Sequence, residues 1–217
     1  PPAPTAANMG QLAPLARGFH ADLGAALNVD GDRVGFVTAE GDALSEEYSL
    51  PLAATARLRR RPGAVVTSYS TSGMVDALAR AHGQRVIRGP IGESQMVDLG
   101  LAEAAVIAGE GSGGVAVLPL NVAYDGLLTL GLVLEEMATG GRTLADVAAG
   151  LPSLVMRKRE LPCPPNLVYR VLDSFRSHHA GDEPDCADGV RLAWGDTWLH
   201  VRASGTEPLL RIIAESP

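Results

Sequence analysis

Runs with the period of an amphipathic helix alternate with short, strand-like apolar runs along the first two-thirds of the sequence. Strands that alternate with helices of about ten to fifteen residues predict α/β units around a mixed or parallel sheet. We expect strands at residues 22–27, 33–38, 64–68, 85–88, 104–108 and 115–118. We expect helices at residues 8–20, 45–58, 72–82, 93–103 and 125–138.

The pattern changes after Pro152. Residues 162–165 are Pro-Cys-Pro-Pro, a sequence that continues neither a helix nor a central strand. Beyond it we expect a helix at residues 166–179, paired strands at 190–194 and 197–201, and a last strand at 209–214. A helix followed by antiparallel strands predicts a separate small α+β domain, with the helix on an antiparallel sheet.

Charge and hydropathy narrow the range of partners. The 217 residues carry a formal net charge of −7 at pH 7, which argues against nucleic acid or an anionic membrane surface as a partner. No apolar run reaches the ~18 residues that a membrane-spanning helix needs. The two cysteines, Cys163 and Cys186, lack CxxC spacing, so a reducing cytoplasm fits better than a disulfide or zinc framework.

The turn at residues 28–33 has the sequence Asn-Val-Asp-Gly-Asp-Arg. Its alternate oxygen-bearing side chains lie on one side of extended backbone and can converge on a hard cation. The EF-hand pattern fails, because its sixth position is Arg33 instead of Gly and its twelfth is Ala39 instead of Glu. A polar turn between two strands is the alternative interpretation.

Residues 109–114, Gly-Glu-Gly-Ser-Gly-Gly, satisfy the spacing GxGxxG. A dinucleotide site needs a helix directly after these glycines, and here the strand pattern 115–118 follows. We therefore reject that site. Glu110 and Ser112 can instead present an acceptor and a hydroxyl to a sugar, and a flexible hairpin is the alternative.

Residues 202–208, Arg-Ala-Ser-Gly-Thr-Glu-Pro, lie between two expected strands. An arginine fork, two hydroxyls and a glycine that frees backbone N–H groups suit a phosphate dianion without a metal. The alternative is a β-hairpin in which Arg202 pairs with Glu207.

Together and in this order, these three loops resemble those of the α-D-phosphohexomutases, whose patterns are D-x-D-x-D-R, G-E-x-S-G or G-E-G-N-G-G, and R-x-S-G-T-x-P. Residues 65–83 and 89–93 are also similar to this family. Its members have four domains. The resemblance implies that residues 1–42 end domain 2, residues 43–152 form domain 3 and residues 153–217 form domain 4. Domain 1, which carries the phosphoserine, has no counterpart, so we expect the chain to be the C-terminal part of such an enzyme.

The resemblance also implies site residues and a cofactor. Arg33 would lie beside the reacting phosphate. Mg²⁺ would be held by Asn28, Asp30 and Asp32, with the absent phosphoserine adding an oxygen. Sugar hydroxyls would be bound by Glu110 and Ser112. The phosphate that does not react would be held by Arg202, Ser204, Gly205 and Thr206.

Three positions depart from the family pattern. Asn28 stands where the family has Asp, which removes one negative charge from the expected metal site. Gly114 stands where some members have His, and Tyr124 where one subgroup usually has Arg. These differences indicate a weakened or specialised relative.

The implied function is that of an isomerase, an intramolecular phosphotransferase that interconverts hexose or hexosamine 6-phosphate and 1-phosphate through a bisphosphate. Phosphoglucosamine mutase and phosphomannomutase are the closest activities within the family. Without the phosphoserine domain, this part alone is expected to be inactive. The alternative is a non-catalytic paralogue that binds sugar phosphates.

Overall fold

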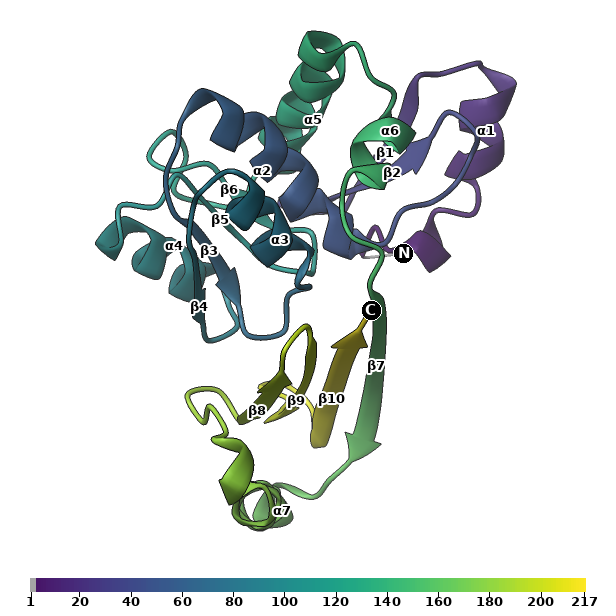
Figure 1. Ribbon diagram of the computed structural model, residues 1–217. Helices are drawn as coiled ribbons and strands as arrows, with labels where there is room; N and C mark the ends of the chain where they lie inside the picture. The colour runs from purple at the N-terminus through teal and green to yellow at the C-terminus, as the bar shows by residue number, and fades with distance from the viewer. Residues whose placement is uncertain (1–2) are drawn as a thin grey trace. The chain divides into compact units, whose positions relative to one another are not determined.

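The structure is a computed structural model that describes residues 3–217. It divides into two compact units, one that ends at Pro152 and one from Ser153 to Pro217 (Figure 1). The acidic and glycine-rich turns belong to the first unit, and residues 202–208 belong to the second.

The first unit begins with a β-hairpin that carries the acidic turn. Strand β1 (Leu23–Leu27) pairs antiparallel with β2 (Val34–Thr38), so that residues 28–33 close the hairpin. Helix α1 (Leu12–Gly18) packs on these strands and is shorter than the helix expected at 8–20. Pro14 explains the late start, because proline lacks an N–H and is tolerated only near the beginning of a helix.

A four-stranded sheet follows, with the order β4-β3-β5-β6. Strand β3 pairs parallel with β4 and β5, whereas β5 and β6 pair antiparallel. The prediction of a mixed sheet is confirmed. The strands are β3 (Val65–Ser68), β4 (Val86–Gly89), β5 (Ile107–Gly109) and β6 (Val115–Ala116). Strand β5 starts later than the expected residue 104, because Ala104 has a left-handed backbone, φ 50°, where the preceding helix ends.

Helices cover both faces of this sheet (Figure 1). They are α2 (Ser49–Arg60), α3 (Met74–Ala81), α4 (Glu93–Ala102) and α5 (Gly126–Gly140). Val65 and Ile107 are buried with α2 and α3, whereas the next residues of the same strands, Val66 and Ala108, are buried with α4. Successive strand residues face opposite sides, so the sheet supports a hydrophobic core on each face.

A short sixth helix follows α5. Helix α6 (Leu144–Ala149) was not expected, because its six residues are too few to show a period. A capping box between Thr143 and Asp146 stabilises its first turn.

A buried carboxylate lies between two of the helices. Glu136 of α5 is only 1% exposed and bonds to Arg59 of α2 and to Arg142. This carboxylate therefore links α2 to α5.

No helix within residues 3–217 is both long and apolar enough to cross a bilayer.

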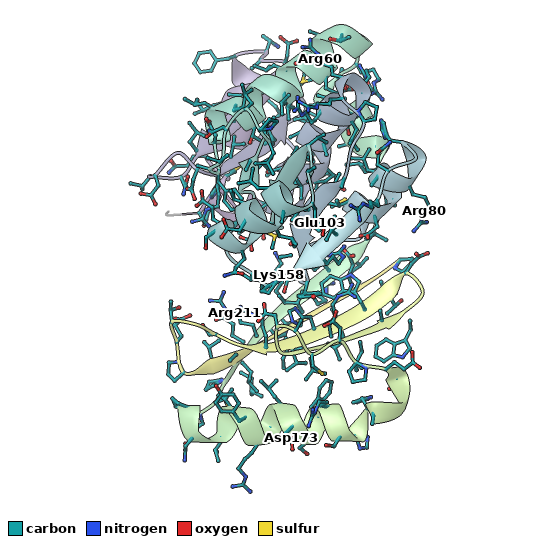
Figure 2. All side chains as sticks on the ribbon, turned by 90° about the vertical axis from the view of Figure 1, so that its left-hand side faces the viewer. Arg60, Arg80, Glu103, Lys158, Asp173 and Arg211 are labelled. Atoms are coloured by element: carbon teal, nitrogen blue, oxygen red, sulfur yellow. The ribbon has the colours of Figure 1, made fainter. Side chains whose placement is uncertain are left out.

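The second unit is one helix on a four-stranded antiparallel sheet with the order β7-β10-β9-β8. Helix α7 (Pro165–His178) contacts β8, β9 and β10. The strands are β7 (Val155–Pro162), β8 (Val190–Trp194), β9 (Thr197–Ala203) and β10 (Leu209–Ser216). Figure 2 shows Lys158 and Arg211 on the sheet and Asp173 on the helix.

Strand β7 has no counterpart among the expected strands. Its charged run, residues 157–160, shows no apolar alternation, and most of the strand is exposed. It lies at the edge of the sheet, and within residues 3–217 it pairs with β10 alone. Charged edge strands of this kind are formed by their backbone hydrogen bonds and discourage further pairing.

Candidate functional site

The acidic turn and the glycine-rich turn meet in the first unit. Arg33 forms an antiparallel backbone bridge with Gly114. The N–H of Gly126, at the start of α5, donates to the carbonyl of Gly31 at 2.8 Å. The loops expected to hold a metal and a sugar, which are about eighty residues apart in sequence, thus lie side by side.

Asn28 organises the acidic turn from within. Its side chain is 7% exposed; Oδ1 accepts the N–H of Arg33 at 3.1 Å, and Nδ2 donates to Asp32 Oδ1. The Arg33 N–H fixes this orientation, because a reversed amide would put two donors against each other and two oxygens together. The Asn28 oxygen is therefore used inside the turn in this structure, and its role as a metal ligand stays a prediction.

The other residues of the acidic turn fit a magnesium ion. Asp30 is exposed and Asp32 is half-buried, and Mg²⁺ is commonly held by one or two carboxylates together with waters and phosphate oxygens. Asp30 and Asp32 are the side chains that would hold it. Arg33 Nε lies 3.7 Å from Asp32 Oδ2. Across residues 3–217, no group of three or more His, Cys, Asp and Glu side chains comes together as a metal centre.

The glycine-rich turn forms the tip of the β5–β6 hairpin, and a strand follows it in place of a helix. Glu110 is 8% exposed, and its Oε1 accepts the N–H of Gly92 at 2.8 Å. Gly111 packs against the buried carboxylate of Glu47, so closely that a Cβ would lie 2.1 Å from Oε2. Ser112 is half-buried and is the side chain of this turn most open to a ligand.

Tyr124 packs against the glycine-rich turn. Its ring packs on Gly114, where a Cβ would lie 2.2 Å from Tyr124 Cδ2, and its N–H donates to Glu93 Oε1 at 2.7 Å. Burial, and then the charge of Glu110, raise the pKa of the Tyr124 phenol. The sequence singled out this residue only as a departure from the family pattern. The contact with Gly114 is tertiary and leaves no local signal.

In the second unit, residues 202–208 connect β9 and β10. Arg202 Nε donates to Asp188 Oδ1 at 3.4 Å, whereas Glu207 Oε2 pairs with Arg211 Nη2 at 3.3 Å. The loop does connect two antiparallel strands, as the hairpin alternative expected, but the Arg202–Glu207 pair of that alternative is wrong. Asp188 was missed by the sequence reasoning, because it reaches Arg202 only through the pairing of β8 with β9.

Other residues of this loop have polar groups that are available to a ligand. The Ser204 N–H donates to the Leu209 carbonyl at 2.9 Å, which closes the loop. Ser204 Oγ is buried and has no hydrogen-bond partner within the described part of the chain. Gly205 and Thr206 are exposed. A buried hydroxyl without a partner, beside an arginine, is the arrangement expected of a loop that receives an anion.

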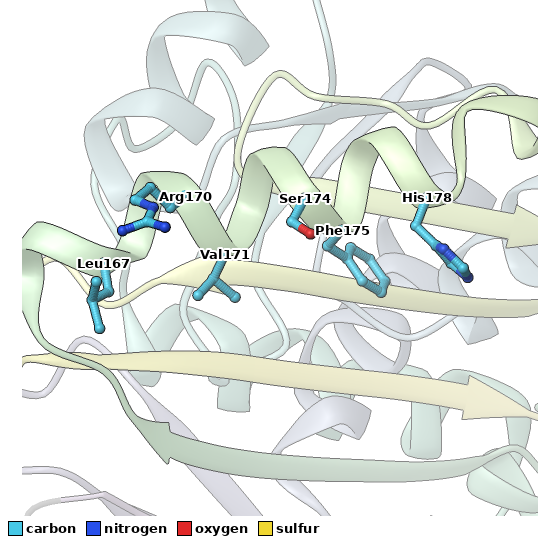
Figure 3. Close-up of a pocket in the computed structure, with 6 residues that line it drawn as sticks. All are labelled: Leu167, Arg170, Val171, Ser174, Phe175 and His178. Atoms are coloured by element: carbon cyan, nitrogen blue, oxygen red, sulfur yellow. The ribbon is translucent and has the colours of Figure 1, made fainter.

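A pocket of about 590 Å³ runs along α7 in the same unit. Figure 3 shows its side chains, which come from one side of the helix and include none of the expected site residues. Its lining residues are Leu167, Arg170, Val171, Ser174, Phe175 and His178.

Two family models match the chain. Residues 45–154 match the model described as phosphoglucomutase/phosphomannomutase, alpha/beta/alpha domain III, and residues 171–217 match the C-terminal domain of the same family. The chain belongs to the phosphohexomutase family. Within this family, the matched domains correspond to the mixed sheet and to the antiparallel unit described above.

Several phosphohexomutases resemble the chain over nearly its whole length. A probable phosphoglucosamine mutase of Methanopyrus kandleri is 33% identical over 219 aligned positions, covering 99% of this chain and 48% of the relative. A phosphoglucomutase/phosphomannomutase of Thermococcus kodakarensis is 29% identical, with the same coverage. The chain spans about half the length of the curated relatives it matches.

Solved phosphohexomutase structures agree with this fold. A phosphoglucomutase/phosphomannomutase family protein of Burkholderia thailandensis superposes with a TM-score of 0.86 at 26% identity, covering 99% of this chain and 47% of that one. The N-acetylphosphoglucosamine mutase of Aspergillus fumigatus, solved with GlcNAc-6P and magnesium, has a TM-score of 0.61 at 16% identity, covering 88% and 48%. At that identity, the second likeness concerns the fold alone.

Proposed function

We propose that this chain supplies the magnesium turn, the sugar turn and the phosphate loop of an enzyme that interconverts hexose or hexosamine 6-phosphate and 1-phosphate. The observation that carries the proposal is the Arg33–Gly114 bridge, which puts the acidic turn directly beside the glycine-rich turn. A mutase needs this adjacency, because the sugar must lie next to the place where its phosphoryl group is transferred.

Each loop has one task in this proposal. Arg33 would stand beside the reacting phosphate. Asp30 and Asp32 would hold Mg²⁺, which would supply positive charge to offset that of the phosphoryl group. Glu110 and Ser112 bind sugar hydroxyls. The other phosphate is held by Arg202, Ser204, Gly205 and Thr206.

A fixed phosphate loop explains how one site serves both ends of the substrate. The sugar is phosphorylated at one end, turns over as a bisphosphate and donates from the other end. Contacts to hydroxyls near the middle of the ring serve both orientations, while Arg202 holds whichever phosphate is idle. We propose that residues 1–42 end the second domain of such an enzyme and that residues 43–152 and 153–217 are its third and fourth domains. The phosphoserine donor belongs to a segment outside these 217 residues.

Calorimetry with two positional isomers tests this proposal. Glucosamine 6-phosphate and glucosamine 1-phosphate are both expected to bind the chain in the presence of Mg²⁺ and to compete for one site. Glucosamine without a phosphate should bind far more weakly, because it lacks the charge-assisted contacts to Arg202. If only one isomer binds, or if the isomers bind without competing, the mutase proposal is wrong.

A second candidate, a non-catalytic binder of sugar phosphates, is favoured by Asn28. Its carboxamide completes the turn without a cation, since it bonds both to the Arg33 N–H and to Asp32. A turn that is stable without metal would suit a protein that binds sugar phosphates and transfers nothing.

The variant Asn28→Asp separates the two candidates. We expect Mg²⁺ to bind about tenfold more tightly, because extra ligand charge strengthens divalent-ion sites. Without Mg²⁺ the melting temperature should fall, because two carboxylates would face each other where the amide now donates to Asp32. Both quantities can be measured by calorimetry and by thermal melting with and without a chelator.

Asn121→Asp is the matched control. Asn121 also donates to an aspartate four residues later, Asp125, at 3.0 Å, but it lies outside the acidic turn. This variant should lose stability without gaining affinity for Mg²⁺. Equal behaviour of the two variants would mean that residue 28 is not a metal ligand, which favours the non-catalytic binder.

A further inference from the structure

The glycine-rich turn is anchored at its residue Gly111. Gly111 lies between Glu110 and Ser112, the two residues proposed to bind the sugar. It is buried, and its N–H donates to the hydroxyl oxygen of Thr71 at 3.1 Å. A buried backbone N–H is costly without an acceptor. Thr71 therefore fixes the peptide group that joins Glu110 to Gly111, although it lies forty residues earlier in the sequence.

Thr71 reaches the turn because two parallel strands end at the same edge of the sheet. Strand β3 pairs parallel with β5, with Thr67 opposite Gly109. Thr71 belongs to the loop that follows β3, and residues 110–114 of the glycine-rich turn follow β5. Loops at the carboxyl ends of parallel strands commonly form the ligand site of an open α/β sheet. The contact between Thr71 and the turn therefore lies at the edge where a ligand is expected.

Buried polar groups hold Thr71 itself in place. Thr71 is 0% exposed, and its hydroxyl oxygen lies 2.9 Å from that of Ser68. Arg88, whose side chain is 13% exposed, donates through Nη1 to the carbonyls of Ser68 and Thr71, at 2.7 and 2.9 Å. The Nη2 group of this guanidinium pairs with Asp76 of α3. The backbone and the hydroxyl of Thr71 are therefore each held by a separate partner.

A buried carboxylate also joins this loop to the turn. Glu47 is 4% exposed, and a Cβ on residue 111 would lie 2.1 Å from its Oε2. The same oxygen accepts the N–H of Ser72, the residue after Thr71, at 3.0 Å. Glu47 thus explains why residue 111 is glycine, and it leaves the Gly111 N–H to the Thr71 hydroxyl.

We propose that Thr71 is a positioning residue for sugar recognition: its hydroxyl fixes the peptide between Glu110 and Gly111, and with it the directions in which Glu110 and Ser112 meet the sugar. This inference rests on the proposed function of Glu110 and Ser112 as ligands of sugar hydroxyls. Because Thr71 is fully buried, it acts through the turn and does not touch the substrate.

The experiment compares glucosamine 6-phosphate with inorganic phosphate in calorimetric titrations of the whole chain. Thr71→Val keeps the size of the side chain and removes the acceptor of the Gly111 N–H. We expect affinity for glucosamine 6-phosphate to fall about tenfold, because a released turn would hold its binding conformation only about a tenth of the time. Affinity for inorganic phosphate, which needs only the loop at 202–208, should be unchanged. Thr71→Ala removes the same acceptor without placing a methyl group against the Gly111 N–H, and should give the same loss.

Two further variants serve as controls. Thr71→Ser restores the hydroxyl and should bind glucosamine 6-phosphate as tightly as the native chain. Thr67 is also 0% exposed, but its hydroxyl donates to the carbonyl of Gly109, at 2.9 Å, within paired strands. Thr67→Val should therefore lower the melting temperature by a few degrees, as Thr71→Val does, and should leave both affinities unchanged.

The outcomes separate this inference from the proposed function. If the native chain binds glucosamine 6-phosphate and Thr71→Val binds it equally well, the positioning role is wrong and the proposed function stands. If Thr67→Val loses as much affinity for the sugar phosphate as Thr71→Val, or if Thr71→Ser does not restore it, Thr71 only stabilises the core and the inference fails. If the native chain binds inorganic phosphate but gains nothing from the sugar, the proposed function and this inference fail together.

Discussion

Replacing Arg202 with alanine is expected to weaken glucosamine 6-phosphate binding by about 2 kcal/mol or more, roughly thirtyfold, because a charge-assisted contact to a phosphate is lost. Arg202 Nε lies 3.3 Å from Asp188 Oδ2 and 3.4 Å from Asp188 Oδ1. This contact orients the guanidinium and leaves its terminal amino groups for a dianion. Calorimetry with glucosamine 6-phosphate and with inorganic phosphate measures the loss, which should be similar for the two ligands.

Two further variants sharpen this result. Arg202→Lys keeps the charge but loses the planar fork, so its affinity should lie between those of the native chain and the alanine variant. Arg176→Ala removes the same charge from α7, where Arg176 pairs with Asp173 on the surface, and should have little effect. Both tryptophans, Trp194 and Trp198, lie in the second unit, so their fluorescence reports whether that unit stays folded. Unchanged affinity in a folded Arg202→Ala protein would reject the phosphate loop.

The double variant Arg59→Ala with Arg142→Ala is expected to destabilise the first unit by about 3 kcal/mol or more. It leaves the carboxylate of Glu136 buried without its two cationic partners, and an uncompensated buried charge is costly. Glu136 is 1% exposed, whereas both arginine side chains are 40% exposed. Urea unfolding followed by circular dichroism at the helical band measures the change, because the first unit has no tryptophan.

A third substitution should restore most of the lost stability. Adding Glu136→Leu to the double variant removes the stranded charge and fills its space with an apolar side chain, which is often neutral or stabilising. Arg60→Ala is the matched control: Arg60 pairs with Glu135 on the same two helices, but it is 68% exposed, so its loss should cost less than about 1 kcal/mol. If the double variant is no less stable than this control, Glu136 does not hold α2 and α5 together.

The sequence predicted those elements whose signal is local. The strands at Val65–Ser68 and Val190–Trp194 are short and rich in β-branched or apolar residues, and the structure has both at the expected positions. Strand β7 was missed, because an edge strand needs only one partner and its side chains carry no apolar period. Helix α6 was missed, because one and a half turns are too short to display one.

In the candidate site, too, the sequence predicted the residues with a local signal and missed those defined by tertiary contacts. The three loops were visible as motifs, because glycine, aspartate, serine and arginine are required there for local reasons. Their partners were not visible: Tyr124 reaches Gly114 and Asp188 reaches Arg202 only after strands have paired and helices have packed. The amide of Asn28 is an intermediate case, since its position in the turn was evident and its bond to Asp32 was not.

The backbone bridge between Arg33 and Gly114 restricts how this site can be altered by evolution or by design. Main-chain pairing does not depend on side-chain identity, but it does depend on register. An insertion or deletion in either hairpin tip would therefore shift Arg33 and Gly114 out of register with each other. Substrate preference in proteins built this way should therefore change through replacements at constant loop length. A loop grafted from a relative would keep its place only if both tips were transplanted together.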